Sequence, residues 1–260
     1  MIHRLIIFTG KGGVGKTTAA LSYALYLHKN GHKVKYNSFY QAPEKNLVDK
    51  LEIPLFEMTV EESAEIYIGN KLGSKTIASW IMGTHFFKSL FQMIPGLGHM
   101  ILLGHILKEL ELDPELTIIL DSPASGHALT MFESSSNFKK IFRTGLIVKD
   151  IEKMRASLED ENYLKTYIMA LPNELAIQEA TELVEELKSV YKNMEIVINN
   201  SIVKYCQENA IDENELPEFL KIKAEIEKQV LNGYKSLPHV PQNEFEKVVQ
   251  ILSQKFGELK

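Results

Sequence analysis

The chain has 260 residues, of which 45% are hydrophobic, and a formal net charge of −5. Its length suits one sizeable α/β domain or at most two small ones, and because no linker marks a second domain we expect residues 1–260 to form a single domain. The acidic balance gives no indication of a nucleic-acid partner. One cysteine, Cys206, excludes an intrachain disulfide or a Cys-x-x-Cys metal site, and with an N-terminus that lacks signal-peptide features it favours a cytoplasmic location.

An apolar strand over residues 5–8 opens the chain and leads through a glycine-rich loop into a helix expected over Lys16–Lys29. The loop satisfies the pattern G-x-x-x-x-G-K-[ST] with Gly10, Gly15, Lys16 and Thr17. Glycines let several backbone N–H groups point to one centre, and the helix N-terminus adds partial positive charge. Lys16 can reach the outer phosphates, and the Thr17 hydroxyl can ligate Mg²⁺. The alternative is a strand-to-helix turn without a ligand. The loop residues are Gly10, Lys11, Gly12, Gly13, Val14, Gly15, Lys16, Thr17 and Thr18.

A second strand is expected near Val34–Phe39, and its sequence is unusually polar for a parallel sheet. Central parallel strands are usually continuous apolar runs. We therefore expect this strand to lie near an edge of the sheet or to have one wet face.

Three helices are expected next. Thr59 and Glu62 have the spacing of a capping box, which predicts a helix to about Leu72, and two more helices follow over 74–91 and 97–110. No Asp, Glu, Lys or Arg occurs between Ser89 and Leu107, so a membrane span must be considered. Pro95, three glycines and two histidines in this run favour core helices with an exposed apolar edge.

A further apolar strand over 115–121 ends in an acid, Asp121. A carboxylate there lies at the carboxyl edge of a parallel sheet, the same edge as the glycine-rich loop. Such an aspartate can hold Mg²⁺ through water. Together with Thr17, Asp121 therefore predicts a metal site beside the phosphates.

The remaining chain alternates strands and helices. This alternation predicts a three-layer α/β fold with a mostly parallel central sheet flanked by helices. We treat the helical segments 59–110 and 131–162 as elaborations of that fold rather than separate domains. The expected elements are a helix over 132–161, a strand over 167–171, a helix over 175–190, a strand over 196–199, a mostly helical stretch over 201–234, a short strand or loop over 237–241 and a terminal helix over 245–256.

The loop sequence GKGGVGKTT, with Lys11 after its first glycine, resembles the deviant Walker A class of P-loop NTPases. That class includes arsenite-pump ATPases, tail-anchored-protein-targeting ATPases, MinD and the nitrogenase iron protein. The resemblance implies ATP or ADP with Mg²⁺, and a homodimer that meets through the nucleotide face. It also implies that Lys11 crosses the interface to the partner's nucleotide, where positive charge assists phosphoryl transfer. The alternative is a solvated loop lysine.

A second motif, DSPASGH over 121–127, is similar to the second switch segment, D-T-A-P-T-G-H, of the arsenite-pump and tail-anchored-targeting branch. It places Ser125, Gly126 and His127 in that switch. His127 could act in the switch or merely make local hydrogen bonds at a helix start.

Three later stretches extend the resemblance through nearly the whole chain. Residues 196–200 are similar to the V-V-N-Q strand whose asparagine reads adenine, which implies that role for Asn199. Pro238 begins a proline-containing loop similar to the one that borders the base. Residues 171–175 with Glu179 look like the branch's P-E-x-L-x-x-x-E segment.

The first switch departs from the family pattern. Where the family has D-P-A-H-x-L, this chain has Gln41, Ala42, Pro43 and Glu44, so alanine replaces the aspartate thought to orient the attacking water. Gln41 could hold that water instead, and Glu44 could do so if the loop shifts. Positioning is most of what a protein contributes to phosphoryl transfer, so slow hydrolysis is a real alternative.

Three functions follow. The leading one is an ATP-hydrolysing, nucleotide-switched homodimer that drives a transport or targeting partner, with Lys11, Lys16 and Gln41 as the catalytic candidates. The second is a nucleotide-gated binding protein with little turnover. The third is a MinD-like regulator at a membrane surface, suggested by apolar and basic residues in the terminal helix, although packing of that helix on the sheet explains them as well. The client is not identified by the sequence.

Overall fold

The computed structural model describes residues 2–38, 45–85, 87, 89, 96–122, 146–188, 191–231 and 233–259. Its centre is a six-stranded sheet of order β2-β3-β1-β4-β5-β6 in which all neighbouring strands are parallel. The predicted α/β class with a mostly parallel central sheet is confirmed. The strands are β1 Leu5–Gly10, β2 Val34–Asn37, β3 Thr117–Asp121, β4 Leu164–Ala170, β5 Met194–Ser201 and β6 Lys235–Pro238.

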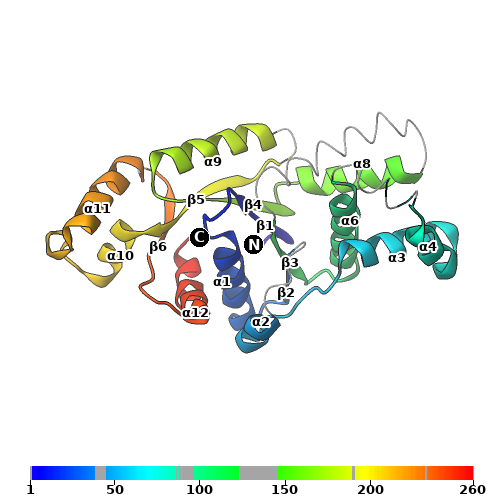
Figure 1. Cartoon of the computed structure of the whole chain (residues 1–260), viewed down its shortest axis with the longest axis horizontal. Helices are drawn as coiled ribbons and strands as arrows, with labels where there is room; N and C mark the ends of the chain where they lie inside the picture. The colour runs from blue at the N-terminus through cyan, green and yellow to red at the C-terminus, as the bar shows by residue number, and fades with distance from the viewer. Residues whose placement is uncertain are drawn as a thin grey trace.

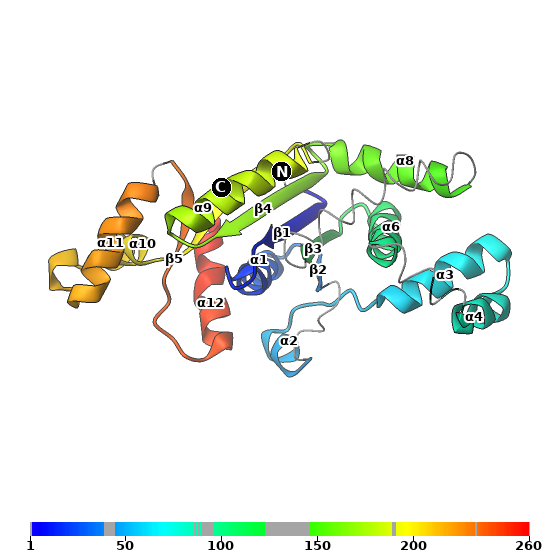
Figure 2. The ribbon, with the colours of Figure 1, turned by 45° about the horizontal axis from the view of Figure 1, so that its top comes forward.

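Helices cover both faces of the sheet, with α8 and α9 on one side and α1 and α12 on the other (Figures 1 and 2). They are α1 Lys16–Lys29, α2 Lys45–Leu51, α3 Val60–Leu72, α4 Lys75–Gly83, α6 Leu97–Leu112, α8 Leu146–Glu159, α9 Glu174–Leu187, α10 Ile202–Asn209, α11 Glu218–Val230 and α12 Phe245–Lys255, with short 3-10 helices at Glu213–Glu215 and Phe256–Leu259.

The alternation of side chains along β1 builds two cores. Leu5 and Ile7 point into a core formed with α6, α8 and α9, whereas Ile6 and Phe8 point into a core formed with α1, α2 and α12. Successive side chains of a strand face opposite sides of the sheet, and β1 is covered on both sides, so every residue of β1 is buried. This burial fixes the strand that carries the glycine-rich loop.

Strand β2 lies at one edge of the sheet, as its polar sequence predicted. Its polar residues have specific partners: Lys35 pairs with Glu109 at 2.8 Å, and Asn37 donates to the carbonyl of Phe56 at 2.9 Å. The backbone of residues 54–56 runs along the outer side of β2, where Tyr36 donates to Pro54 at 2.8 Å and accepts from Phe56 at 2.9 Å.

The capping box at Thr59 is confirmed, since Thr59 Oγ1 accepts from the Glu62 backbone and Glu62 accepts from the Thr59 backbone. The α6 helix packs its apolar face into the core, whereas Trp80 on α4 is 72% exposed. The prediction of a core helix therefore holds for α6, whereas α4 buries only Ala78 and lies mostly at the surface. Among the residues described, none of the helices combines the length and the apolar character needed to cross a membrane.

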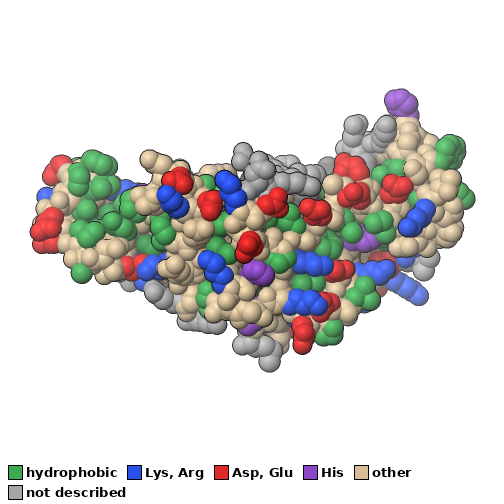
Figure 3. All heavy atoms as spheres, turned by 90° about the horizontal axis from the view of Figure 1, so that it is seen from below, with side chains coloured by type: hydrophobic (Ala, Val, Ile, Leu, Met, Phe, Trp, Pro, Cys, Tyr) green, Lys and Arg blue, Asp and Glu red, His purple; other side chains and the backbone are tan. Residues whose placement is uncertain are grey.

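The terminal helix α12 packs against α1. Val249, Leu252 and Phe256 are buried there, and the Phe256 ring meets the Phe8 ring edge-on at 6.3 Å. The membrane-surface alternative needs apolar residues of the terminal helix to be available to lipid, whereas these three are packed inside the protein. On the side of the molecule seen in Figure 3, Lys and Arg lie interspersed with Asp and Glu rather than in one basic surface.

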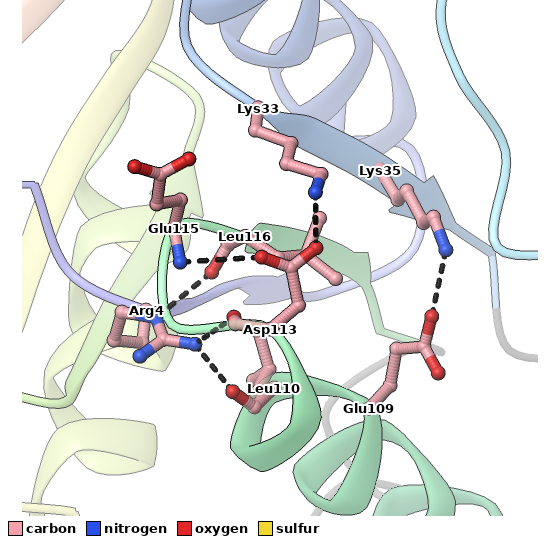
Figure 4. A network of polar contacts seen from close by, with 8 residues as sticks. All are labelled: Arg4, Lys33, Lys35, Glu109, Leu110, Asp113, Glu115 and Leu116. Atoms are coloured by element: carbon pink, nitrogen blue, oxygen red, sulfur yellow. Dashed lines mark hydrogen bonds and ion pairs between the residues drawn. The ribbon is translucent and has the colours of Figure 1, made fainter.

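Arg4 joins three parts of the fold at the edge opposite the glycine-rich loop (Figure 4). Its guanidinium donates to the carbonyl of Leu116 at 2.8 Å and to the carbonyls of Leu110 and Asp113 at the end of α6. The carboxylate of Asp113 in turn pairs with Lys33 just before β2. One side chain therefore satisfies carbonyls at a helix C-terminus that would otherwise lack partners.

We expect Arg4→Met to lower the free energy of unfolding by about 2–3 kcal/mol, because hydrogen bonds from a charged donor are lost while the carbonyls stay in place. Urea unfolding followed by circular dichroism measures this. Arg155→Met is the matched control, since Arg155 makes only an exposed pair with Glu159 among the described contacts, and it should change stability by less than about 0.5 kcal/mol. Equal losses in the two variants would contradict the role of Arg4.

Candidate nucleotide-binding site

The glycine-rich loop lies between β1 and α1 at the carboxyl edge of the sheet. Gly10 and Gly15 have φ values of 140° and 88°, which residues with a Cβ adopt rarely. A Cβ on Gly10 would lie 2.4 Å from the Met169 carbonyl oxygen of β4, and one on Gly15 would lie 2.1 Å from Asn199 Nδ2 of β5. The loop therefore passes against two neighbouring strands where only glycine fits.

The first turn of α1 is open to an anion. Gly15 is the N-cap residue, and within the described chain no side chain caps this end of the helix and no acidic residue occupies the first turn. The first N–H groups of a helix lack intrahelical partners and carry partial positive charge. Both features fit a phosphate group, which would accept from these amides.

Lys16 bends back over the loop, where its Nζ donates to the carbonyl of Lys11 at 2.8 Å. Burial lowers the pKa of Lys16, and the negative charge of Asp121 opposes that shift. An ammonium held at the loop in this way is a suitable partner for phosphate oxygens.

Asp121 ends β3, directly beside Phe8 of β1, and is buried. Its Oδ2 accepts from Thr17 Oγ1 at 2.6 Å and from the Tyr36 hydroxyl at 2.9 Å. Burial raises the pKa of Asp121, while the hydrogen bonds from Thr17 and Tyr36 and the charge of Lys16 lower it. The site thus holds a carboxylate and a threonine hydroxyl within one hydrogen bond of each other.

These oxygens suit Mg²⁺, which takes hard ligands and keeps several waters. In the described ranges no three His, Cys, Asp or Glu side chains gather as a metal-binding group. A cation held by Thr17 and Asp121 would complete its shell with phosphate oxygens and water, as Mg²⁺ does at phosphate sites.

Asn199 and Pro238 lie at the same edge, on the next strands along. Asn199 Nδ2 donates to the Val14 carbonyl at 3.0 Å, so its amide contacts the phosphate loop directly. The neighbouring Asn200 has a positive φ of 65°, and its Oδ1 accepts from Nδ1 of His239, the residue after Pro238, at 2.6 Å. The structure therefore brings Asn199 to the loop and Pro238 to the end of β6; their contacts with a base stay predictions.

Lys11 is half-exposed and lies 3.5 Å from Glu179 on α9. Glu179 belongs to the segment that the sequence singled out beside the glycine-rich motifs, and the pair lies within one chain. Exposed pairs of this kind contribute little, about 0–1 kcal/mol. Lys11 is therefore held only weakly by its own chain.

Residues 41–44 of the first switch and residues 123–127 of the second lie outside the described residues. The predictions for Gln41, Ala42 and Pro43 and for Ser125, Gly126 and His127 accordingly stay predictions. Tyr36 and the pairing of Glu179 with Lys11 were not foreseen from the sequence. Alternation along β2 could have indicated that Tyr36 faces inward, because Val34 and Tyr36 share one face and are both buried.

A glycine-rich loop, an uncapped helix N-terminus and a carboxylate on the adjacent parallel strand, all at one sheet edge, define a P-loop nucleoside triphosphatase fold. The chain matches the anion-transporting ATPase (ArsA) family over residues 3–147, more than half of its length. It belongs to this family of ATPases.

The individual relatives are distant in sequence, but the similarity extends over most of this chain. The chain is 26% identical to a protein named "Putative arsenical pump-driving ATPase 2" of Aquifex aeolicus, over 88% of this chain and 87% of the relative. It is 23% identical to ATPase GET3 of Podospora anserina, over 77% of this chain and 73% of the relative. It is also 24% identical to the ATPase ASNA1 homolog of Plasmodium vivax, over 84% of this chain but only 56% of the relative.

Proposed function

We propose that residues 1–260 form one MgATP-binding domain that acts as a nucleotide-switched homodimer, hydrolyses ATP and drives a transport or targeting partner. The observation that carries this proposal is the 2.6 Å hydrogen bond between Thr17 and Asp121, because it joins the phosphate loop to a carboxylate on the next strand. Together the Thr17 hydroxyl and the Asp121 carboxylate could hold a metal ion against the phosphates. A cytoplasmic location is part of this proposal and is favoured by the single cysteine.

The proposal gives a role to the residues of the phosphate loop and to three residues on neighbouring strands. The backbone N–H groups from Gly12 to Thr18 would bind phosphate oxygens, and Lys16 would neutralise the outer phosphates. Thr17 and Asp121 would hold Mg²⁺, which supplies charge neutralisation when bound. Asn199 and Pro238 would border the base. Lys11 would act on the nucleotide of a second chain, for which its exposed position and weak pairing are suitable.

Equilibrium binding of a fluorescent ATP analogue in Mg²⁺ tests the proposal. We expect Lys16→Ala to weaken binding by about 10- to 100-fold, since charge-assisted hydrogen bonds to phosphate are lost. Lys29→Ala, at the exposed far end of α1, is the matched control and should bind as the wild type does. Equal affinity of wild type and Lys16→Ala would overturn the proposed nucleotide site.

A second candidate is a nucleotide-gated binding protein with little turnover, and the observation that favours it is Ala42 in the first switch. In that case ATP would favour one conformation through differential affinity alone. Single-turnover hydrolysis by the wild type separates the two functions. Tight ATP binding with hydrolysis no faster than background would establish the second.

A further inference from the structure

We propose that Tyr36 is a positioning residue for Asp121: its phenol fixes the carboxylate that holds Mg²⁺ beside the nucleotide. This inference rests on the proposed MgATP site and assigns a role to a strand, β2, that contributes no residue to the phosphate loop. It starts from the hydrogen bond of 2.9 Å between the Tyr36 hydroxyl and Asp121 Oδ2.

Tyr36 is itself held rigidly. Its side chain is fully buried, and its residue pairs with Ile119 in the register of β2 and β3. On the outer side its backbone makes hydrogen bonds with Pro54 and Phe56 at 2.8 and 2.9 Å. Because the strand is held from both sides, the phenol oxygen has a fixed location relative to β3.

The two hydroxyl donors act on the same oxygen of Asp121. Thr17 and Tyr36 approach Oδ2 from different elements, α1 and β2, so rotation of the carboxylate would break both hydrogen bonds. Among the described contacts Oδ1 has no hydroxyl donor, which leaves it as the oxygen available to a metal-bound water. Partners that orient a ligating group commonly affect metal affinity about 10- to 100-fold.

The same contacts link the metal site to the helical elaboration. The segment 54–56 that pairs with Tyr36 leads directly to Thr59, the cap of α3.

The test compares ADP binding by wild type and Tyr36→Phe in the full chain, in EDTA and over a Mg²⁺ titration. We expect Tyr36→Phe to raise the Mg²⁺ concentration for half-maximal enhancement of ADP affinity about tenfold, with unchanged affinity in EDTA. Tyr67→Phe is the matched control, because the Tyr67 hydroxyl also donates to an aspartate, Asp150, at 2.8 Å on α8. This variant should match the wild type in both conditions.

A double-mutant arm uses Asp121→Asn, which should abolish the enhancement by Mg²⁺, so that adding Tyr36→Phe has no further effect. An unchanged Mg²⁺ midpoint in Tyr36→Phe, or an equal loss of affinity in EDTA and Mg²⁺, would overturn the role of Tyr36. Absence of ADP binding by the wild type would instead overturn the proposed function, and the metal role of Tyr36 with it.

Discussion

Gly10→Ala is expected to destabilise the nucleotide-free protein by about 3–5 kcal/mol, through backbone strain and overpacking together. Gly10 has a φ of 140°, and its added methyl group would meet the Met169 carbonyl oxygen of β4 at 2.4 Å. That oxygen belongs to the backbone of the sheet and cannot move aside as a flexible side chain would. The urea midpoint of unfolding, followed by circular dichroism, measures the effect.

Gly12→Ala is the control within the same loop. Gly12 does not have a positive φ, and a Cβ there would meet no atom of the described chain within 4 Å. Its midpoint without nucleotide should equal that of the wild type. If Gly10→Ala unfolds at the wild-type midpoint as well, the close passage of the loop against β4 is wrong.

Lys11→Ala has the largest expected effect on activity. If Lys11 supplies positive charge to the nucleotide of a second chain, its loss should lower ATP turnover by about 10³-fold, as for an arginine finger. The affinity of a single chain for ATP should change only a few-fold. Within its own chain the Lys11 side chain pairs with Glu179 on α9, so its loss leaves the loop amides that bind phosphate in place. Steady-state turnover and binding, measured on the same preparation, separate the two quantities.

Glu179→Gln serves as the comparison, because it removes the partner of Lys11 and keeps the lysine. It should retain wild-type turnover or exceed it slightly. Specific activity of the wild type should also rise with protein concentration as chains associate. Full turnover by Lys11→Ala, or a specific activity independent of concentration, would leave Lys11 as a solvated loop residue.

The elements and the loop could be predicted because their signals are local. The glycine pattern, the capping box at Thr59 and the polar character of β2 are each contained within a few residues, and the structure bears out the capping box and the edge position of β2. Strand β4 was harder: it begins at Leu164, three residues before the predicted start. Lys165 and Thr166 are polar, so the sequence does not indicate a buried strand at this point. In the structure Lys165 forms an ion pair with Glu195 of β5, and Thr166 is buried.

The contacts that complete the site depend on which strands become neighbours. Tyr36 and Asp121 are 85 residues apart, and they meet only because β2 pairs with β3. Asn199 and Val14 are 185 residues apart and meet because β4 and β5 follow β1 in the sheet. No spacing rule along the chain encodes such distances, so these contacts required the structure.

The outer margins of the sheet limit how two copies can associate. At the β2 margin the outward backbone N–H and C=O of Tyr36 are engaged by Pro54 and Phe56, and β6 is short, with Lys235 exposed and Pro238 lacking an N–H donor. Both margins are thereby poorly suited to adding a strand from another molecule. These margins disfavour a continuous intermolecular sheet and the amyloid-type stacking that starts from open sheet edges. If two copies associate, loops and helices are the better suited surfaces.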